Sequence, residues 1–290
     1  MNETVLNFDS EKQEFYINHP KFDKLNFREM SQELFNKDSS HFIIKDFIAK
    51  DLAIQVRDFY SKTKNSESFV QSSENGNHRI FFYENSPYTY PKFITSLLKH
   101  SMVIKNRMYE NHDYYQIYCM IKDVNPKNYN EVARLQNLHQ WSSIYWYKNG
   151  NSHFRHIDSF GELACFVNFT KKNEDYQSGG LQIEIEGGDA FSLDDSYDYG
   201  DMIFLDQSQV FHEVLPIQTI ENQVGRMQLY IPTIPHNYMK KTLVFEGYEN
   251  EIFFTNEEIP LDKKKKLSDE ESSDEIHYSR KIFKHFKSNL

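Results

Sequence analysis

A series of short strand-like segments between residues 140 and 232 constrains the possible fold more than any other feature of the sequence. Residues 163–169 form a nearly continuous apolar run, which is typical of a buried strand. Residues 181–186 alternate apolar and polar side chains, which indicates a half-buried strand. Further short strands are predicted at 202–205, 210–215 and 227–231, and the Gly179–Gly180 pair is interpreted as a turn. Many short strands with glycine turns predict a sandwich or jelly roll.

Helical patterns precede this region. Apolar residues recur at helical spacing between residues 48 and 60 and again between 93 and 108, and we interpret both segments as helices packed on the sheet. A similar group lies between residues 27 and 35. Short strands are predicted at 41–45 and 79–83, an extended segment at 114–121 and a polar loop at 61–79. The predicted fold class is therefore mainly β with flanking helices (α+β).

His156 and Asp158 are separated by one residue in a segment that we expect to be extended. Because side chains alternate along a strand, this imidazole and this carboxylate point to the same face. They supply two thirds of a 2-His-1-carboxylate triad, which holds Fe(II) on one side and leaves the other side open for ligands. His212, on a later predicted strand, is the natural third ligand.

Arg226 follows His212 on the next predicted strand. A buried arginine near such a metal can bind a carboxylate through two parallel hydrogen bonds, as a dicarboxylic co-substrate would require. A purely structural salt bridge is the alternative for Arg226. For the histidines and Asp158, the alternative is a set of unrelated polar residues in the core.

Six sequence elements occur in one order, and together they are more specific than any one motif. They are Tyr147 with Gly150, His156 with Asp158, the Gly179–Gly180 pair, Gly200-Asp201, His212-Glu213-Val214 and Gly225-Arg226. In this order the chain resembles the Fe(II)/2-oxoglutarate-dependent dioxygenases, closest to their prolyl-hydroxylase-like branch. The resemblance covers about residues 140–235 and extends faintly to residues 41–48.

The resemblance implies a double-stranded β-helix, a form of jelly roll, with helices outside it. It divides the chain into an N-terminal extension packing on the core (1–40), an oxygenase domain (41–250, metal core 140–235) and a charged C-terminal segment with a helix (251–290). It also places the hydroxyl of Tyr147 near the co-substrate. Where some relatives have a tyrosine that binds the distal carboxylate, this chain has Phe166. Tyr230, on the strand face of Arg226, is the candidate to replace that hydroxyl, and simple core packing is the alternative for both tyrosines.

The activity implied is hydroxylation of an unactivated C–H bond in a small metabolite, an amino acid or a peptidyl residue, with release of succinate and CO₂. Fe(II), 2-oxoglutarate and O₂ are the expected cofactor and co-substrates, with ascorbate in a supporting role. Related halogenases have a small residue where this chain has Asp158, so halogenation is not expected. Two alternatives stay open: desaturation, cyclisation or oxidative decarboxylation at the same iron site, or a catalytically silent jelly-roll binding protein.

The net charge of −10 disfavours a nucleic-acid partner, because binding to the phosphate backbone depends on clustered lysine and arginine. No apolar run approaches the roughly 18 residues of a membrane span, and the polar N-terminus does not resemble a secretory signal. We therefore expect a cytoplasmic protein. Cys119 and Cys165 have no spacing typical of zinc or of a disulfide framework, so buried free thiols are predicted.

Overall fold

The computed structural model describes residues 4–36, 39–62, 70–71, 74, 76–81, 91–109, 125, 142–157, 163–185, 188–207 and 210–231. The helices are α1 (His19–Phe22), α2 (Phe27–Asn36), α3 (Lys50–Lys62), α4 (Lys92–Tyr109) and the 3₁₀ turn η2 (Leu193–Asp195). The strands are β1 (Leu6–Asp9), β2 (Glu14–Ile17), β3 (His41–Ile44), β4 (Val70–Gln71), β5 (His78–Phe81), β6 (Ser143–Tyr147), β7 (His153–His156), β8 (Leu163–Asn168), β9 (Tyr176–Ile185), β10 (Ala190–Ser192), β11 (Met202–Asp206), β12 (Val210–Thr219) and β13 (Arg226–Ile231). The predicted segments at 114–121 and 251–290, and Cys119, lie outside the described residues.

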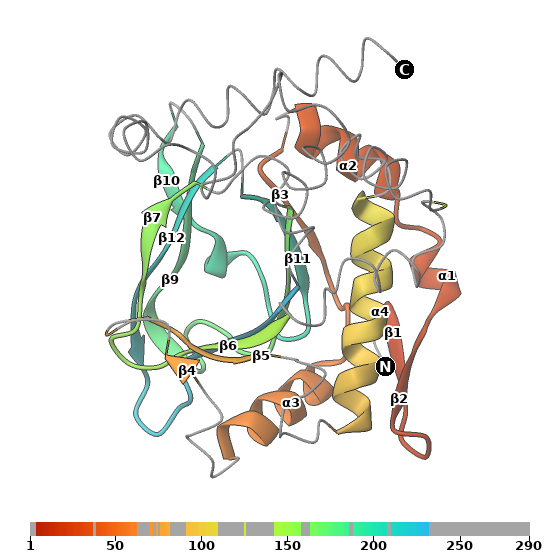
Figure 1. Cartoon of the computed structure of the whole chain (residues 1–290), viewed down its shortest axis with the longest axis horizontal. Coiled ribbons are helices and arrows are strands. Elements are labelled where there is room, and N and C mark those ends of the chain that lie inside the picture. Colours follow the sequence, from red (N-terminus) through yellow and green to blue (C-terminus); the bar gives the residue numbers. More distant parts are fainter. Residues whose placement is uncertain are drawn as a thin grey trace, which may run out of the picture.

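Two antiparallel sheets form the centre of the fold (Figure 1). The seven-stranded major sheet has the order β3-β11-β8-β13-β6-β5-β4, and the four-stranded minor sheet has the order β10-β9-β12-β7. Consecutive strands β6 to β9 pass from one sheet to the other, as expected for a double-stranded β-helix. The predicted fold class, mainly β with a jelly-roll core and flanking helices, is confirmed.

Strand alternation divides the core into two layers. On β8, Ala164 and Phe166 point between the two sheets, whereas Cys165 and Val167 point to the opposite face of the major sheet. That opposite face packs against the helices, so β8 is buried on both sides as its apolar run predicted. Cys165 is a buried free thiol, as expected.

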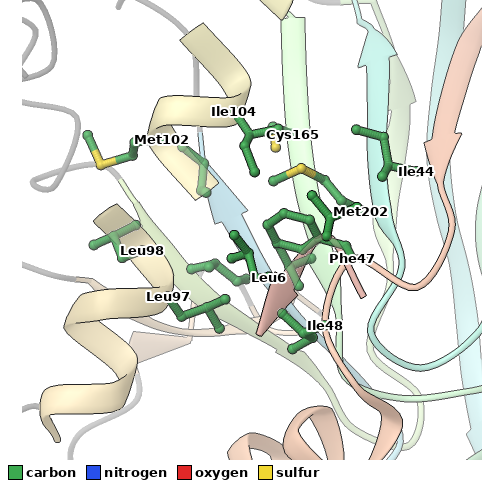
Figure 2. Close-up of a cluster of buried hydrophobic side chains, with 14 of the residues drawn as sticks. Leu6, Ile44, Phe47, Ile48, Leu97, Leu98, Met102, Ile104, Cys165 and Met202 are labelled. Carbon is green, nitrogen blue, oxygen red and sulfur yellow. The ribbon is translucent and has the colours of Figure 1, made fainter. Parts of the chain in front are cut away.

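The outer layer joins helix α4 to the major sheet (Figure 2). Leu97 and Ile104 of α4 lie across from Phe47 and Met202 in this cluster, and all four side chains are fully or almost fully buried. In Figure 1, helices α2 and α4 lie beyond β3 and β11, on the side away from the minor sheet, and α3 lies below β5 and β6. The helices therefore cover the outer face of the major sheet, and the inner face of that sheet points toward the minor sheet.

Residues 4–36 contribute to the same layer. The sequence of this part is polar, and its β1–β2 hairpin was not predicted. The backbone amides of Val5 and Leu6 donate to the carbonyls of Asp46 and Phe47, at 3.0 and 2.8 Å. Phe15 is buried in the cluster that contains α4.

Several predicted boundaries differ from those observed. The segment 61–79, predicted to be a polar loop, contains the end of α3, strand β4 and the start of β5. The Gly179–Gly180 pair is not a turn between strands, because both residues lie inside β9 with φ values of +86° and +104°. None of the helices in the described part of the chain is long and apolar enough to cross a membrane.

Candidate active site

A cavity of about 200 Å³ lies between the inner faces of the two sheets. Its walls come from β5, β6, β8 and β13 of the major sheet and from β7, β9 and β12 of the minor sheet. Five of the six residues predicted from the sequence line it: Tyr147, His156, His212, Arg226 and Tyr230. The sixth, Asp158, lies outside the described residues.

His156 and His212 come together because their strands are neighbours in the minor sheet. They are directly opposite each other in the antiparallel pairing of β7 with β12, and their ring centroids are 4.2 Å apart. His212 is buried, with 4% of its surface exposed, whereas His156 is partly exposed. The pairing of β7 with β12 thus brings together two histidines that are far apart in the sequence.

The hydrogen bonds of both rings define which nitrogen carries the proton. Nδ1 of His156 lies 2.8 Å from the carbonyl oxygen of Phe154, and Nδ1 of His212 lies 3.3 Å from that of Val210. A carbonyl can only accept, so Nδ1 is the donor in each ring and Nε2 of a neutral ring carries the lone pair. Metal-binding histidines commonly donate their second nitrogen to a backbone carbonyl in this way. Nε2 of His212 lies 3.1 Å from the side-chain amide nitrogen of Gln207, which fits an acceptor at that position.

The third ligand position is not filled from the described residues. No group of three His, Cys, Asp or Glu side chains that could hold a metal is found within the described ranges. His153 also lines the cavity, with its ring centroid 4.9 Å from that of His156. The assignment of Asp158 as the third ligand therefore stays a prediction.

Arg226 lies at the start of β13 and is completely buried. Its Nε donates to Oδ2 of Asp194 at 2.8 Å and its Nη2 to Oδ1 at 3.2 Å, so the two side chains form a two-pronged ion pair. Nη2 also lies 3.1 Å from the hydroxyl of Tyr197. Burial by itself lowers the pKa of Arg226, but Asp194 and the nearby tyrosines outweigh burial and hold that pKa well above its usual range.

Asp194 is the centre of this buried network. Besides Arg226, its carboxylate accepts hydrogen bonds from the hydroxyls of Tyr176, at 2.6 Å, and Tyr197. Burial, followed by the negative charge of Asp194, raises the pKa of Tyr176 well above its usual value, so this hydroxyl stays a donor. A Cβ atom on Gly180 would collide with Oδ2 of Asp194, and the φ of +104° at Gly180 also favours glycine. Gly180 therefore makes room for the carboxylate that holds Arg226.

Three buried polar atoms in the walls of the cavity have no hydrogen-bond partner among the described residues. They are Nη1 of Arg226, Oε1 of Gln207 and Oε1 of Gln228. Buried polar groups are almost always satisfied, so three such atoms around one cavity indicate a polar ligand. An imidazole pair with two Nε2 lone pairs fits a divalent transition metal, and Nη1 of Arg226 fits a carboxylate oxygen.

The two predicted tyrosines occupy different positions. The hydroxyl of Tyr147 accepts a hydrogen bond of 2.9 Å from the side-chain amide of Asn77, and burial raises the pKa of Tyr147. Tyr230 lies opposite Phe166 in the β13–β8 pairing, with ring centroids 5.3 Å apart. Tyr230 therefore stands beside the position where the expected hydroxyl is missing.

Sequence analysis missed several residues of the site. Gln228 could have been found, because it lies two positions after Arg226 and so shares its strand face. Asp194 could not, since nothing in its local sequence connects it with a residue of β13. Gln207 and Arg79 also line the cavity, from a turn after β11 and from β5.

The fold and the site together define a double-stranded β-helix with a histidine pair and a buried arginine around one internal cavity. No protein-family model matches the chain, and no curated protein matches it.

Several solved structures resemble it. One is a prolyl-4-hydroxylase from Pseudomonas putida, at 12% identity and a TM-score of 0.48, with 70% of this chain and 96% of that chain covered. Another is a prolyl hydroxylase from Trichoplax adhaerens in complex with a hypoxia inducible factor peptide fragment, at 14% identity and a TM-score of 0.49, with 78% and 96% covered. A third is the non-heme alpha ketoglutarate dependent carbocyclase SnoK from nogalamycin biosynthesis, at 10% identity and a TM-score of 0.43, with 76% and 91% covered. At identities of 10–14% the likeness concerns the fold alone.

Proposed function

We propose that this protein is an Fe(II)/2-oxoglutarate-dependent oxygenase that hydroxylates a C–H bond of a small metabolite, an amino acid or a peptidyl residue. One observation carries the proposal: His156 and His212 face each other in a cavity lined by the buried Arg226, whose Nη1 has no hydrogen-bond partner among the described residues. The ordered sequence motifs, with Asp158 after His156, support the same conclusion.

In this proposal His156, His212 and Asp158 hold the metal. The carbonyls of Phe154 and Val210 fix the tautomer and the orientation of the two rings, so no proton has to leave Nε2 before the metal binds. When bound, Fe(II) supplies oxidation of a substrate C–H bond by O₂ while 2-oxoglutarate is converted to succinate and CO₂.

Arg226 binds the distal carboxylate of 2-oxoglutarate through Nη1. Nε and Nη2 stay with Asp194, which keeps the guanidinium in one orientation before the co-substrate arrives. Tyr147 and Tyr230 shape the same wall of the cavity, and Tyr230 is the proposed source of the hydroxyl that Phe166 lacks. The residues thus orient the co-substrate and exclude water from it.

The experiment is an anaerobic Fe(II) titration in the presence of 2-oxoglutarate, monitored by the visible charge-transfer band of the chelate, followed by measurement of succinate in air. His212→Ala should lose most Fe(II) binding while its circular dichroism spectrum is unchanged. His100→Ala is the matched control, because this ring lies on α4 and contacts the carbonyl of Ser96. Full Fe(II) affinity in His212→Ala, or a wild-type protein that forms neither the band nor succinate, would refute the proposal.

A further inference from the structure

A second arginine lines the cavity, on the opposite side of Tyr145 from β13. Arg79 of β5 pairs in register with Tyr145 of β6, and Tyr145 in turn pairs with Gln228 of β13. The three side chains form one row across the inner face of the major sheet, and all three line the cavity. Arg226 belongs to the next row, because it pairs with Tyr147. Two residues along a strand separate these rows, which corresponds to roughly 7 Å.

Arg79 and Arg226 differ in how their charges are balanced. The Nε of Arg79 donates to Oδ1 of Asn77 at 2.8 Å, and its guanidinium carbon lies 4.4 Å from the ring centroid of Tyr145. Both contacts orient the guanidinium, and neither neutralises it. Among the described residues no carboxylate forms an ion pair with Arg79, and no acceptor binds its two terminal nitrogens.

Gln228 supplies an independent sign of a ligand in the same row. Its side chain is 2% exposed, and its Oε1 has no hydrogen-bond partner among the described residues. Because an amide oxygen can only accept, it would meet a hydroxyl or N–H donor elsewhere on a polar ligand whose anionic group reaches the guanidinium of Arg79. The row therefore offers one positive charge, one buried amide and an aromatic ring between them.

We propose that Arg79 binds a carboxylate of the substrate that is oxidised, so that the substrate is an organic acid. This inference rests on the proposed function, in which Arg226 and the histidine pair engage the two ends of 2-oxoglutarate. Arg79 is not one of these residues, so its guanidinium can bind a second anion in the same cavity. A free acid and the C-terminal carboxylate of a peptide share this chemistry.

Benzoate and benzamide are suitable probes, because they differ in charge and little in shape. Binding of each is measured by ligand-observed NMR, with and without saturating 2-oxoglutarate. Wild-type protein should bind benzoate about tenfold more tightly than benzamide, and Arg79→Gln should lose this preference while benzamide binding is unchanged. Arg79→Lys should retain part of it. Hippurate carries its carboxylate after a peptide bond, so it imitates the C-terminus of a peptide. Tighter binding of hippurate than of benzoate indicates a peptide substrate, and tighter binding of benzoate indicates a small free acid.

Arg155→Gln is the matched control. Arg155 neighbours His156 in β7, but its guanidinium pairs with Glu184 and stacks on Phe211 rather than lining the cavity. This variant should keep the wild-type preference for benzoate.

The outcomes separate this inference from the proposed function. An equal affinity of wild-type protein for benzoate and benzamide overturns the role of Arg79, even if succinate is formed. So does a loss of 2-oxoglutarate binding in Arg79→Gln, because Arg79 would then be the co-substrate anchor. The protein could also prefer benzoate through Arg79 and yet bind no 2-oxoglutarate. That result would support the anion site at Arg79 and refute the proposed oxygenase function.

Discussion

The ion pair between Arg226 and Asp194 allows a quantitative test of how this cavity is held together. Both side chains are completely buried, and two hydrogen bonds join them. Arg226→Met leaves a buried carboxylate without its cation, and Asp194→Asn leaves a buried guanidinium without its anion. Each single change should lower the free energy of unfolding by about 3–5 kcal/mol, as is usual when one partner of a buried pair is removed.

The double variant should be less unstable than the two single changes together predict. In Arg226→Met with Asp194→Asn no uncompensated charge is buried, and the asparagine oxygen can still accept from the hydroxyls of Tyr176 and Tyr197. We expect a coupling energy of about 2–3 kcal/mol, in the upper part of the range for residues in direct contact. Urea unfolding monitored by tryptophan fluorescence and circular dichroism measures all four proteins.

The pair formed by Arg155 and Glu184 is the matched control for this cycle. Its nitrogen–oxygen distance is 2.9 Å, but the two side chains are 43% and 33% exposed. Exposed ion pairs contribute about 0.2–1 kcal/mol, so its coupling energy should fall in that range. A coupling energy for Arg226 and Asp194 as small as that of the exposed pair would refute the conclusion that the buried carboxylate balances the charge of Arg226.

Three further predictions address other parts of the molecule. Gly180→Ala should lower the free energy of unfolding by more than about 2 kcal/mol, because the added Cβ displaces Asp194 and the φ of Gly180 is positive. Gly150→Ala is the control, since its Cβ meets open space and only the φ of +79° is unfavourable. Thermal unfolding of the two variants measures the difference. Asp158→Gly should weaken Fe(II) binding and abolish most hydroxylation, and a halogenated product from the wild-type protein in chloride or bromide would show that Asp158 is not a ligand. Burial lowers the pKa of Lys105 from 10.5 to about 7, so the unfolded chain binds more protons between these pH values. Stability should therefore rise as the pH increases from about 7 to 10.5, and urea unfolding across this range should show no such rise in Lys105→Met.

The apolar run at residues 163–169 was sufficient to predict a buried strand, whereas its division between two core layers emerges from the structure. The apolar run of β8 belongs to a strand covered on both faces, and alternation places Phe166 inside the cavity and Cys165 under the helices. The order of the motifs predicted His156 and His212 as a pair of ligands, and the structure places them opposite each other in adjacent strands. Local pattern carried this information because the side-chain period of a strand does not depend on its partners.

The sequence-based predictions were wrong at the start of β5 and at the Gly179–Gly180 pair, where residues do not follow the pattern of a hydrophobic core. Strand β5 was predicted to begin at Arg79 but begins at His78, a polar residue that had been assigned to the preceding loop. Gly179 and Gly180 were interpreted as a turn, although their positive φ values serve close contacts with Pro216 and Asp194 inside a strand. Contacts of this kind join distant segments, and the local sequence contains no sign of them.

The balance of charge around Arg226 leads to a last prediction, about the conditions under which 2-oxoglutarate binds. Asp194 neutralises Arg226 inside the protein, so in the proposed function the distal carboxylate would meet a hydrogen-bond donor, Nη1, and little net positive charge. The attraction for a dianion must then come mainly from the metal. We expect metal-free protein to bind 2-oxoglutarate weakly and Mn(II), which does not support turnover, to tighten binding at least about tenfold in calorimetric titrations. With the metal bound, 2-oxopentanoate lacks only the distal carboxylate and should bind about 10- to 100-fold more weakly, the size of one or two charge-assisted hydrogen bonds. Equal affinity for 2-oxoglutarate with and without Mn(II) would mean that Arg226 acts as a free cation, in contradiction to its pairing with Asp194.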